Sequence, residues 1–273
     1  MGKYHWEVIP RGIISAIKHD VETFQKKNPG QRYHLLDAGA SPDAPLALHL
    51  KDKIDEWNPG KAHVTALDVA PQRFSSRKIK YIQGDVHAIP LNENSQHGVI
   101  ASNVLEYAQN KHKALEQISK VLKQSGLLVG VVHAEDSEYP DFLVERAARV
   151  EAIVNALNQI QRLSRKPQDS KLLKSALDAV RNSPMAEGQK KPAAIVEYFL
   201  QNPDRLKVTQ ERFPAAYITL TRELGEKIKA GRFAGIEDIR QHLIPHGLDL
   251  EHYLKLRNGK DTFWMFTARK TGD

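Results

Sequence analysis

The chain has 273 residues, of which 41% are hydrophobic and 27% are charged, and its formal net charge is +7. This composition is typical of a globular protein large enough for one domain and an insertion, and no apolar run approaches the roughly eighteen residues of a membrane span. The absence of cysteine excludes disulfides, thiolate metal sites and a cysteine nucleophile. With no signal-peptide core near the first residues, we expect a cytoplasmic protein whose spread positive charge permits, without requiring, an acidic partner such as RNA.

The first part of the chain predicts a helix, a strand, a tight turn and a second helix. Residues 10–26 place Ile13, Ile17 and Val21 on one helical face, and residues 28–30 break that helix. A short apolar run, residues 33–36, ends at an acid and is followed by small residues. Apolar side chains then recur at helical spacing, namely Leu46, Leu50, Ile54 and Trp57. A strand, a turn and a helix in this order open a nucleotide-binding α/β unit.

The turn between that strand and helix limits the class of ligand. It contains one glycine, Gly39, instead of the G-x-G-x-x-G that holds a diphosphate at a helix N-terminus. Pro42 has no N–H to donate, and Asp43 would repel a phosphate. These residues favour a ligand that has a positive centre and no phosphate, such as S-adenosylmethionine. The alternative is an ordinary strand-to-helix turn.

A second apolar strand, residues 63–67, ends in Asp68. The two oxygens of such a carboxylate can accept hydrogen bonds from both hydroxyls of an adenosine ribose. The alternative is a surface acid that caps a following helix, with Pro71 near its start. We favour the ribose role because Asp37 ends the preceding strand in the same way.

The remaining segments complete a sheet. Apolar strands are predicted at residues 79–83, 99–102 and 127–132, with a helix at residues 111–123 that Gly126 ends. Strands without a polar face indicate a parallel sheet that is buried on both sides. A helix at residues 236–243 precedes strands at residues 248–256 and 262–269, which the turn at residues 258–261 joins as an antiparallel hairpin.

An insertion separates the fifth strand from the helix at residues 236–243. It predicts four amphipathic helices, at residues 142–163, 172–180, 192–200 and 214–230. We therefore expect residues 1–136 and 234–273 to form the nucleotide-binding domain and residues 137–233 to form a helical insertion. The insertion would serve as a lid, a substrate pocket or a homo-oligomer contact. Its aromatic residues Tyr198, Phe199, Phe213 and Tyr217 could shape an acceptor pocket.

Four short motifs, in this order and spacing, resemble those of class I S-adenosylmethionine-dependent methyltransferases. They are Leu-Asp-Ala-Gly-Ala at residues 36–40, Ala-Leu-Asp-Val at 66–69, Gln-Gly-Asp-Val at 83–86 and Ala-Ser-Asn-Val-Leu-Glu-Tyr at 101–107. Residues 89–91 and 102–107 are most similar to the small-molecule branch, such as quinone-biosynthesis methyltransferases. The resemblance implies an α/β, Rossmann-like doubly wound, mostly parallel sheet with an antiparallel C-terminal hairpin and a helical insertion after strand five.

The resemblance also implies a cofactor site for S-adenosyl-L-methionine. Its residues would be Asp37, Gly39, Ala40 and Ser41 at the methionine end, Asp68 and Val69 at the ribose, Asp85 and Val86 at the adenine, and Ser102 and Asn103 beneath the methyl group. Two positions depart from the family pattern. Ser41 replaces a glycine, and Gln96-His97-Gly98 replaces the acid that usually precedes the fourth strand. Either departure could alter or abolish cofactor binding.

Methyl transfer is an in-line displacement from a sulfonium, in which alignment and desolvation supply much of the rate. An oxygen or nitrogen acceptor can also need a base. Our first candidate base is His133, at the end of the fifth strand, followed by Glu106 and Tyr107 just past the fourth. The alternative for His133 is a loop histidine bonded to backbone. We expect His87 to pack beside the adenine.

No metal site is predicted. His242 and His246 have the spacing of a helical metal site, but Pro245 lies between them and no acid follows His242, so we interpret the pair as a helix end.

The predicted function is methyl transfer to an oxygen or nitrogen of a small-molecule acceptor. One alternative is a non-catalytic methyltransferase-like module that binds a partner through the insertion. Another, suggested by the charge of +7, is methylation of RNA or protein. Enzymes that methylate amino groups of nucleic acids use an Asn-Pro-Pro-Tyr-like stretch after the fourth strand. This sequence has none, which makes a nucleic-acid acceptor a weaker hypothesis than a small molecule.

Overall fold

The computed structural model of the protein describes residues 8–73, 76–145, 215–258 and 261–271, with positions 147, 148, 151 and 155. The chain divides into two compact units, Met1–Glu138 with Ala230–Asp273, and Tyr139–Lys229. The helices predicted at residues 172–180 and 192–200, and most of the one at 142–163, lie outside the described residues, as do the side chains of Tyr198, Phe199, Phe213 and Tyr217.

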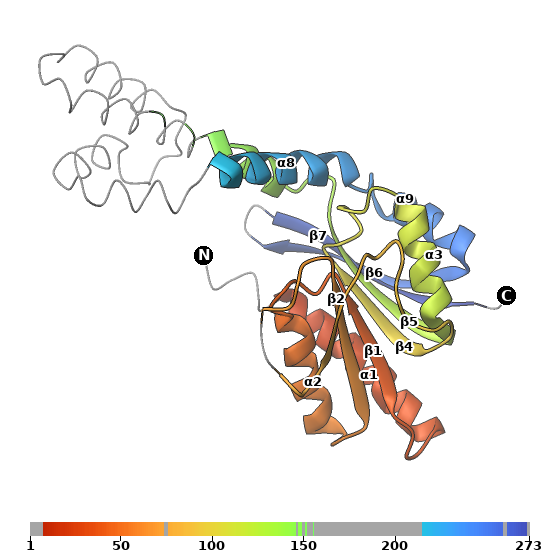
Figure 1. Ribbon diagram of the computed structural model, residues 1–273. Coiled ribbons are helices and arrows are strands. Elements are labelled where there is room, and N and C mark those ends of the chain that lie inside the picture. Colours follow the sequence, from red (N-terminus) through yellow and green to blue (C-terminus); the bar gives the residue numbers. More distant parts are fainter. Residues whose placement is uncertain are drawn as a thin grey trace, which may run out of the picture. The chain divides into compact units, whose positions relative to one another are not determined.

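The first unit is built on a seven-stranded sheet in the order β3-β2-β1-β4-β5-β7-β6 (Figure 1). Strands β1 to β5 run parallel, and β7 is antiparallel to both β5 and β6. The predicted Rossmann-like sheet with its antiparallel C-terminal hairpin is therefore confirmed. The strands are β1 (Tyr33–Ala38), β2 (Ala62–Asp68), β3 (Lys80–Gln83), β4 (Gln96–Ser102), β5 (Leu122–His133), β6 (Leu248–Asn258) and β7 (Asp261–Lys270).

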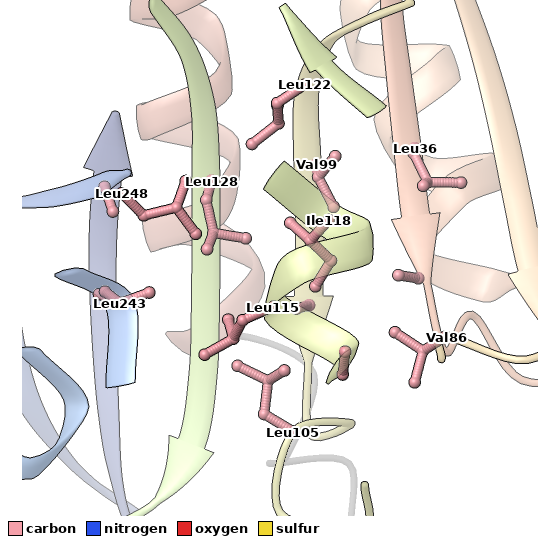
Figure 2. Packing of buried hydrophobic residues seen from close by; sticks show 14 of the residues in the cluster. Leu36, Val86, Val99, Leu105, Leu115, Ile118, Leu122, Leu128, Leu243 and Leu248 are labelled. Atoms are coloured by element: carbon pink, nitrogen blue, oxygen red, sulfur yellow. The ribbon is translucent and has the colours of Figure 1, made fainter. Parts of the chain in front are cut away.

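Helices cover both faces of this sheet because adjacent residues of each strand point to opposite sides. Leu35 packs in one core with the helices α1 (Val8–Lys27) and α2 (Pro45–Trp57). Its neighbour Leu36 packs in the other core with α3 (Lys111–Val121) and α9 (Ile236–Leu243). Figure 2 shows the second core, where Leu115 and Ile118 of α3 lie against Val99 of β4 and Leu128 of β5.

The boundary between α3 and β5 differs from the prediction. The helix ends at Val121 instead of at residue 123, and Gly126 lies inside the strand instead of ending the helix. The reason is tertiary pairing, since Leu122 already pairs with Gln96 of β4. A register shift follows before Gly98 pairs with Leu127, and Ser125 takes a left-handed φ of 62° within it.

The C-terminal elements follow the predicted order. Helix α9 passes into a 3-10 turn, Ile244–His246, and Gly247 ends it with a left-handed φ of 63°. In the second unit, α8 (Ala215–Gly231) is joined by Lys229 to Asp141 at 2.8 Å. None of the described helices is both long and apolar enough to cross a membrane.

Candidate functional site

The crevice lies where the strand order reverses, between β1 and β4. On either side of this point the chain leaves the sheet in opposite directions, which opens a space beyond the carboxyl ends of the strands. A cavity of about 270 Å³ occupies it. The cavity is lined by residues from the ends of β1 to β4, namely Gly39, Leu67, Asp68, Val69, Gly84, Asp85, Val86, His87, Val104, Tyr107, Ala108 and Gln109.

Asp68 is fixed at the end of β2 by two backbone donors. Its Oδ2 accepts a hydrogen bond from the N–H of Ser41, and its Oδ1 accepts one from the N–H of Ala70, both at 2.9 Å. The described residues between β2 and β3 contain no helix, so the alternative interpretation of Asp68 as a helix cap is wrong. Each carboxylate oxygen has a second lone pair, which leaves two acceptor positions for a ligand.

Asp85 is oriented by His87. The Oδ1 atom of Asp85 accepts from the His87 backbone N–H at 2.9 Å and meets the ring Nδ1 at 2.6 Å. Because the Nε2 of His87 accepts from the N–H of Asn110 at 3.3 Å, the ring proton is on Nδ1 and is donated to Asp85. These hydrogen bonds lower the pKa of Asp85, and the bond from the His87 backbone has the largest effect. Its Oδ2 has no hydrogen-bond partner in the described part of the chain and can accept from a ligand.

Asp37, near the carboxyl end of β1, is a buried carboxyl group with only 1% of its surface exposed. Burial, reinforced by the charge of Asp68, raises its pKa to about 7, although the backbone N–H of Ala47 partly opposes the shift. Its Oδ2 has no partner among the described residues. Since Ala47 lies in the first turn of α2, a carboxylate already occupies this helix N-terminus. A phosphate would meet a like charge there, which supports the predicted exclusion of dinucleotides.

The loops that form the crevice contain strained backbone. Ser41, Ala44 and Asn103 have φ values of 64°, 41° and 51°, in the left-handed region that side chains disfavour. Gly39 has a φ of 78°, and a Cβ there would lie 2.7 Å from a methyl carbon of Val104. Gly39 lines the cavity, and the Val104 side chain occupies the space that a Cβ would need. Ser41, which replaces the family glycine, keeps a backbone conformation that glycine adopts freely.

Ser41→Gly is therefore expected to stabilise the protein by about 0.5–1 kcal/mol, because relief of the left-handed strain exceeds the added freedom of the unfolded chain. Ser41→Val should destabilise it, since a β-branched residue disfavours positive φ. Urea unfolding of the three proteins measures both changes. An equal loss of stability in the two variants would show that the serine side chain, and not the backbone, decides the conformation.

The three candidate catalytic residues divide into two groups. Tyr107 lines the cavity, whereas Glu106 and His133 do not. They form a buried pair, with His133 Nδ1 at 2.8 Å from Glu106 Oε1 and side-chain exposures of 4% and 0%. The His133 ring also contacts Phe263 of β7, at 4.7 Å between centroids. His133 is the last residue of β5 instead of a loop residue, and its Nδ1 pairs with a carboxylate.

The predicted cofactor residues also divide by position. Gly39, Asp68, Val69, Asp85 and Val86 line the cavity. The other predicted residues, Asp37, Ala40, Ser41, Ser102 and Asn103, do not line it. The N–H of Ala40 donates to Leu67 at 3.0 Å and that of Asn103 to Val131 at 2.8 Å, which ties β1 to β2 and β4 to β5.

The prediction missed one partner and one neighbour. His87 was expected only to pack, yet it holds Asp85, and the Asp-x-His spacing was the available signal. The contact of Val104 with Gly39 had no signal in the sequence.

The histidines of the C-terminal helix serve structural roles. His242 Nδ1 donates to the carbonyl of Asp238 at 2.8 Å within α9, and His246 lies in the 3-10 turn that follows. Within the described ranges, no group of three histidine or acidic side chains could hold a metal ion.

Comparison with known proteins identifies the fold at this crevice. Residues 51–130 match a family described as a methyltransferase domain. Over 127 residues the chain is 25% identical to a malonyl-[acyl-carrier protein] O-methyltransferase of Enterobacter lignolyticus, covering 44% of this chain. Both matches agree with the resemblance of the four sequence motifs to class I S-adenosylmethionine-dependent methyltransferases. The match spans about half, 47%, of that relative.

Two solved structures share this methyltransferase fold. The CurJ carbon methyltransferase is 14% identical, with a TM-score of 0.50, and the match covers 95% of this chain and 54% of that one. The trans-methyltransferase CalH, solved with S-adenosylhomocysteine, is also 14% identical, with a TM-score of 0.50. The match covers 92% of this chain and 54% of the CalH chain. The superfamily uses S-adenosylmethionine as its cofactor.

Proposed function

We propose that this protein transfers the methyl group of S-adenosylmethionine to an oxygen or nitrogen of a small-molecule acceptor. The observation that carries the proposal is the set of acceptor oxygens around the crevice, from Asp37, Asp68 and Asp85. Each belongs to a different strand end, and two of the three line a cavity of about 270 Å³.

The donors of the cofactor match these acceptors. The ribose hydroxyls are suited to the two remaining acceptor positions of Asp68, and the adenine amino group to Oδ2 of Asp85. The ammonium of the methionine end is suited to the unpartnered Oδ2 of Asp37. Val69, which is 65% exposed, provides an apolar surface beside the ribose.

Neither departure from the family pattern removes one of these groups. Ser41 keeps the left-handed backbone of the glycine that it replaces, and its N–H still reaches Asp68. His97 is the second residue of β4, whereas the crevice lies beyond the other end of that strand, at Ser102. These placements favour an active enzyme over a module that has lost its cofactor.

When bound, the cofactor supplies an electrophilic methyl group on a sulfonium. The protein must then align the acceptor and remove its proton where it has one. Glu106 would act as a positioning residue, since it accepts the Nδ1–H of His133 and makes Nε2 the basic ring nitrogen. Tyr107 lines the cavity and would bind beside the acceptor. We propose His133 as the base and Glu106 as the residue that orients it.

Two observations support this acceptor class: one favours transfer to an oxygen, and the other argues against an amino group of a nucleic acid. The relative from Enterobacter lignolyticus is named as an O-methyltransferase of a carrier-bound malonyl group. The sequence also has no Asn-Pro-Pro-Tyr-like stretch after β4.

The acceptor class can be tested with radiolabelled S-adenosylmethionine. The protein is incubated with the labelled cofactor and a cell extract, and the label is separated into small molecules, RNA and protein. We expect label in the small-molecule fraction and none with a variant that does not bind the cofactor. Label confined to RNA or protein would contradict the proposed acceptor. Cofactor binding without any transfer, over a range of extracts, would favour the non-catalytic module.

A further inference from the structure

A second cavity opens at the other end of the sheet, where the strands begin. Its volume is about 870 Å³, and its lining includes Tyr33, the first residue of β1, and His97, near the start of β4. The end of α1 and the last residues of β7 complete it. The cofactor crevice lies beyond the carboxyl ends of the same strands, so the two cavities share no lining residue.

The two acidic residues of this cavity already have partners within the protein. Asp20 accepts from the hydroxyl of the buried Tyr33 and from the guanidinium of Arg269. The same guanidinium donates to Glu251 at 3.2 Å. Both acids therefore pair with Arg269, and neither is left to neutralise another cation of the cavity.

Three lysines along the cavity have no carboxylate partner in the described part of the chain. Lys270 donates to two neutral oxygens, Asn94 Oδ1 and the carbonyl of Leu122, both at 3.0 Å. Lys27 and Lys123 form no ion pair with a described residue. Four cations, with Arg269, thus face two acids, and the difference leaves a net charge of +2 on the lining.

His97 adds a directed donor to these charges. Its Nδ1 accepts the backbone N–H of His34 at 2.9 Å. Burial, followed by the charges of Lys123 and His34, lowers the pKa of His97 to about 4, so the ring is neutral at pH 7. The single ring proton is then on Nε2, which bonds to no described residue. The ring is held by Phe24 and Tyr33, at 4.3 and 5.3 Å between centroids.

We propose that this cavity is a second ligand site, which binds the phosphate group of a small phosphorylated metabolite or free phosphate. A phosphate dianion would neutralise the net charge of +2 and accept hydrogen bonds from Lys123, Lys27 and His97. The concave shape suits a small ligand better than the extended backbone of a nucleic acid, which is usually tracked by a groove or stripe.

The test is a titration of the full-length protein with inorganic phosphate at constant ionic strength, followed by calorimetry and by NMR of the histidine rings. We expect saturable binding at one site, and Lys123→Met should weaken it by about tenfold or more, the usual effect of losing a charge-assisted bond. Lys80→Met is the matched control, because Lys80 is exposed on β3 at the far edge of the sheet and does not line the cavity. The pKa of His97 should rise when phosphate is bound, since a neighbouring anion favours the imidazolium.

Binding of S-adenosylhomocysteine shows whether the Lys123→Met variant is still folded. Lys123→Met should bind S-adenosylhomocysteine as the unmodified protein does, because Lys123 does not line the crevice. Phosphate binding that does not saturate, or that falls equally in Lys80→Met and Lys123→Met, would overturn the proposal. So would a short oligoribonucleotide that binds far more tightly than phosphate and depends on Lys123, since this face would then be a nucleic-acid surface.

Discussion

Glu106→Ala is expected to lower the free energy of unfolding by about 1–3 kcal/mol, because it removes the carboxylate that accepts from the buried His133 Nδ1. Glu106→Gln is the matched control, since its amide oxygen can still accept from Nδ1, and it should cost about 1 kcal/mol. Urea unfolding at pH 7 measures both. Equal and small losses in the two variants would show that the pair does not stabilise the fold.

The glutamine variant also separates stability from catalysis. If Glu106 orients His133 as a base, Glu106→Gln should lower the rate of methyl transfer by about 10²-fold or more and change its pH profile, although the protein remains folded. A variant with an unchanged pH profile would assign the pair to packing alone.

Asp37→Asn is expected to change how stability depends on pH. The pKa of Asp37 is raised to about 7 in the folded protein, against about 3.9 in an unfolded chain, so the folded state holds the proton more tightly. The contribution of the protonated carboxyl is fully present below pH 4 and is lost as the pH rises through 7. Asparagine does not ionise, so the variant does not lose this contribution. Its free energy of unfolding, relative to that of the unmodified protein, should therefore rise by about 2–4 kcal/mol between pH 4 and pH 8.

The measurement is urea unfolding at several pH values, with Asp43→Asn as the control at an exposed acid of the same loop. A constant difference between Asp37→Asn and the unmodified protein across this range would contradict the raised pKa.

The same carboxyl would link cofactor binding to pH. A cationic ammonium beside Asp37 favours the ionised form, so S-adenosylhomocysteine should bind more tightly as the pH rises from 5 to 7, by up to about tenfold per pH unit. In Asp37→Asn the affinity should be weaker at pH 8 and nearly independent of pH. Persistence of the full pH dependence in this variant would place the ammonium elsewhere.

The sequence was most informative where local patterns determine structure. Apolar runs located the strands. The acids near the carboxyl ends of β1 and β2, Asp37 and Asp68, marked the crevice because parallel strands bring these ends together. The early end of α3 was not predictable, since pairing of Leu122 with Gln96 overrides the helical pattern.

Long-range and backbone features were also beyond the sequence. Glu106 and His133 are 27 residues apart and meet only because β4 and β5 pair. The left-handed conformation of Ser41 is one that its residue type argues against. The second cavity is formed by segments from both ends of the chain, and its charges are adjacent only in the folded protein.

Calorimetric titration with S-adenosylhomocysteine tests most directly whether the crevice holds the cofactor. We predict saturable binding by the unmodified protein, and a loss of about 1–3 kcal/mol in Asp68→Ala, because the ribose hydroxyls lose their acceptors. Asp52→Ala, at an exposed acid of α2 away from the cavity, should bind as the unmodified protein does. No binding at millimolar ligand, or equal affinities for Asp68→Ala and Asp52→Ala, would contradict the assignment.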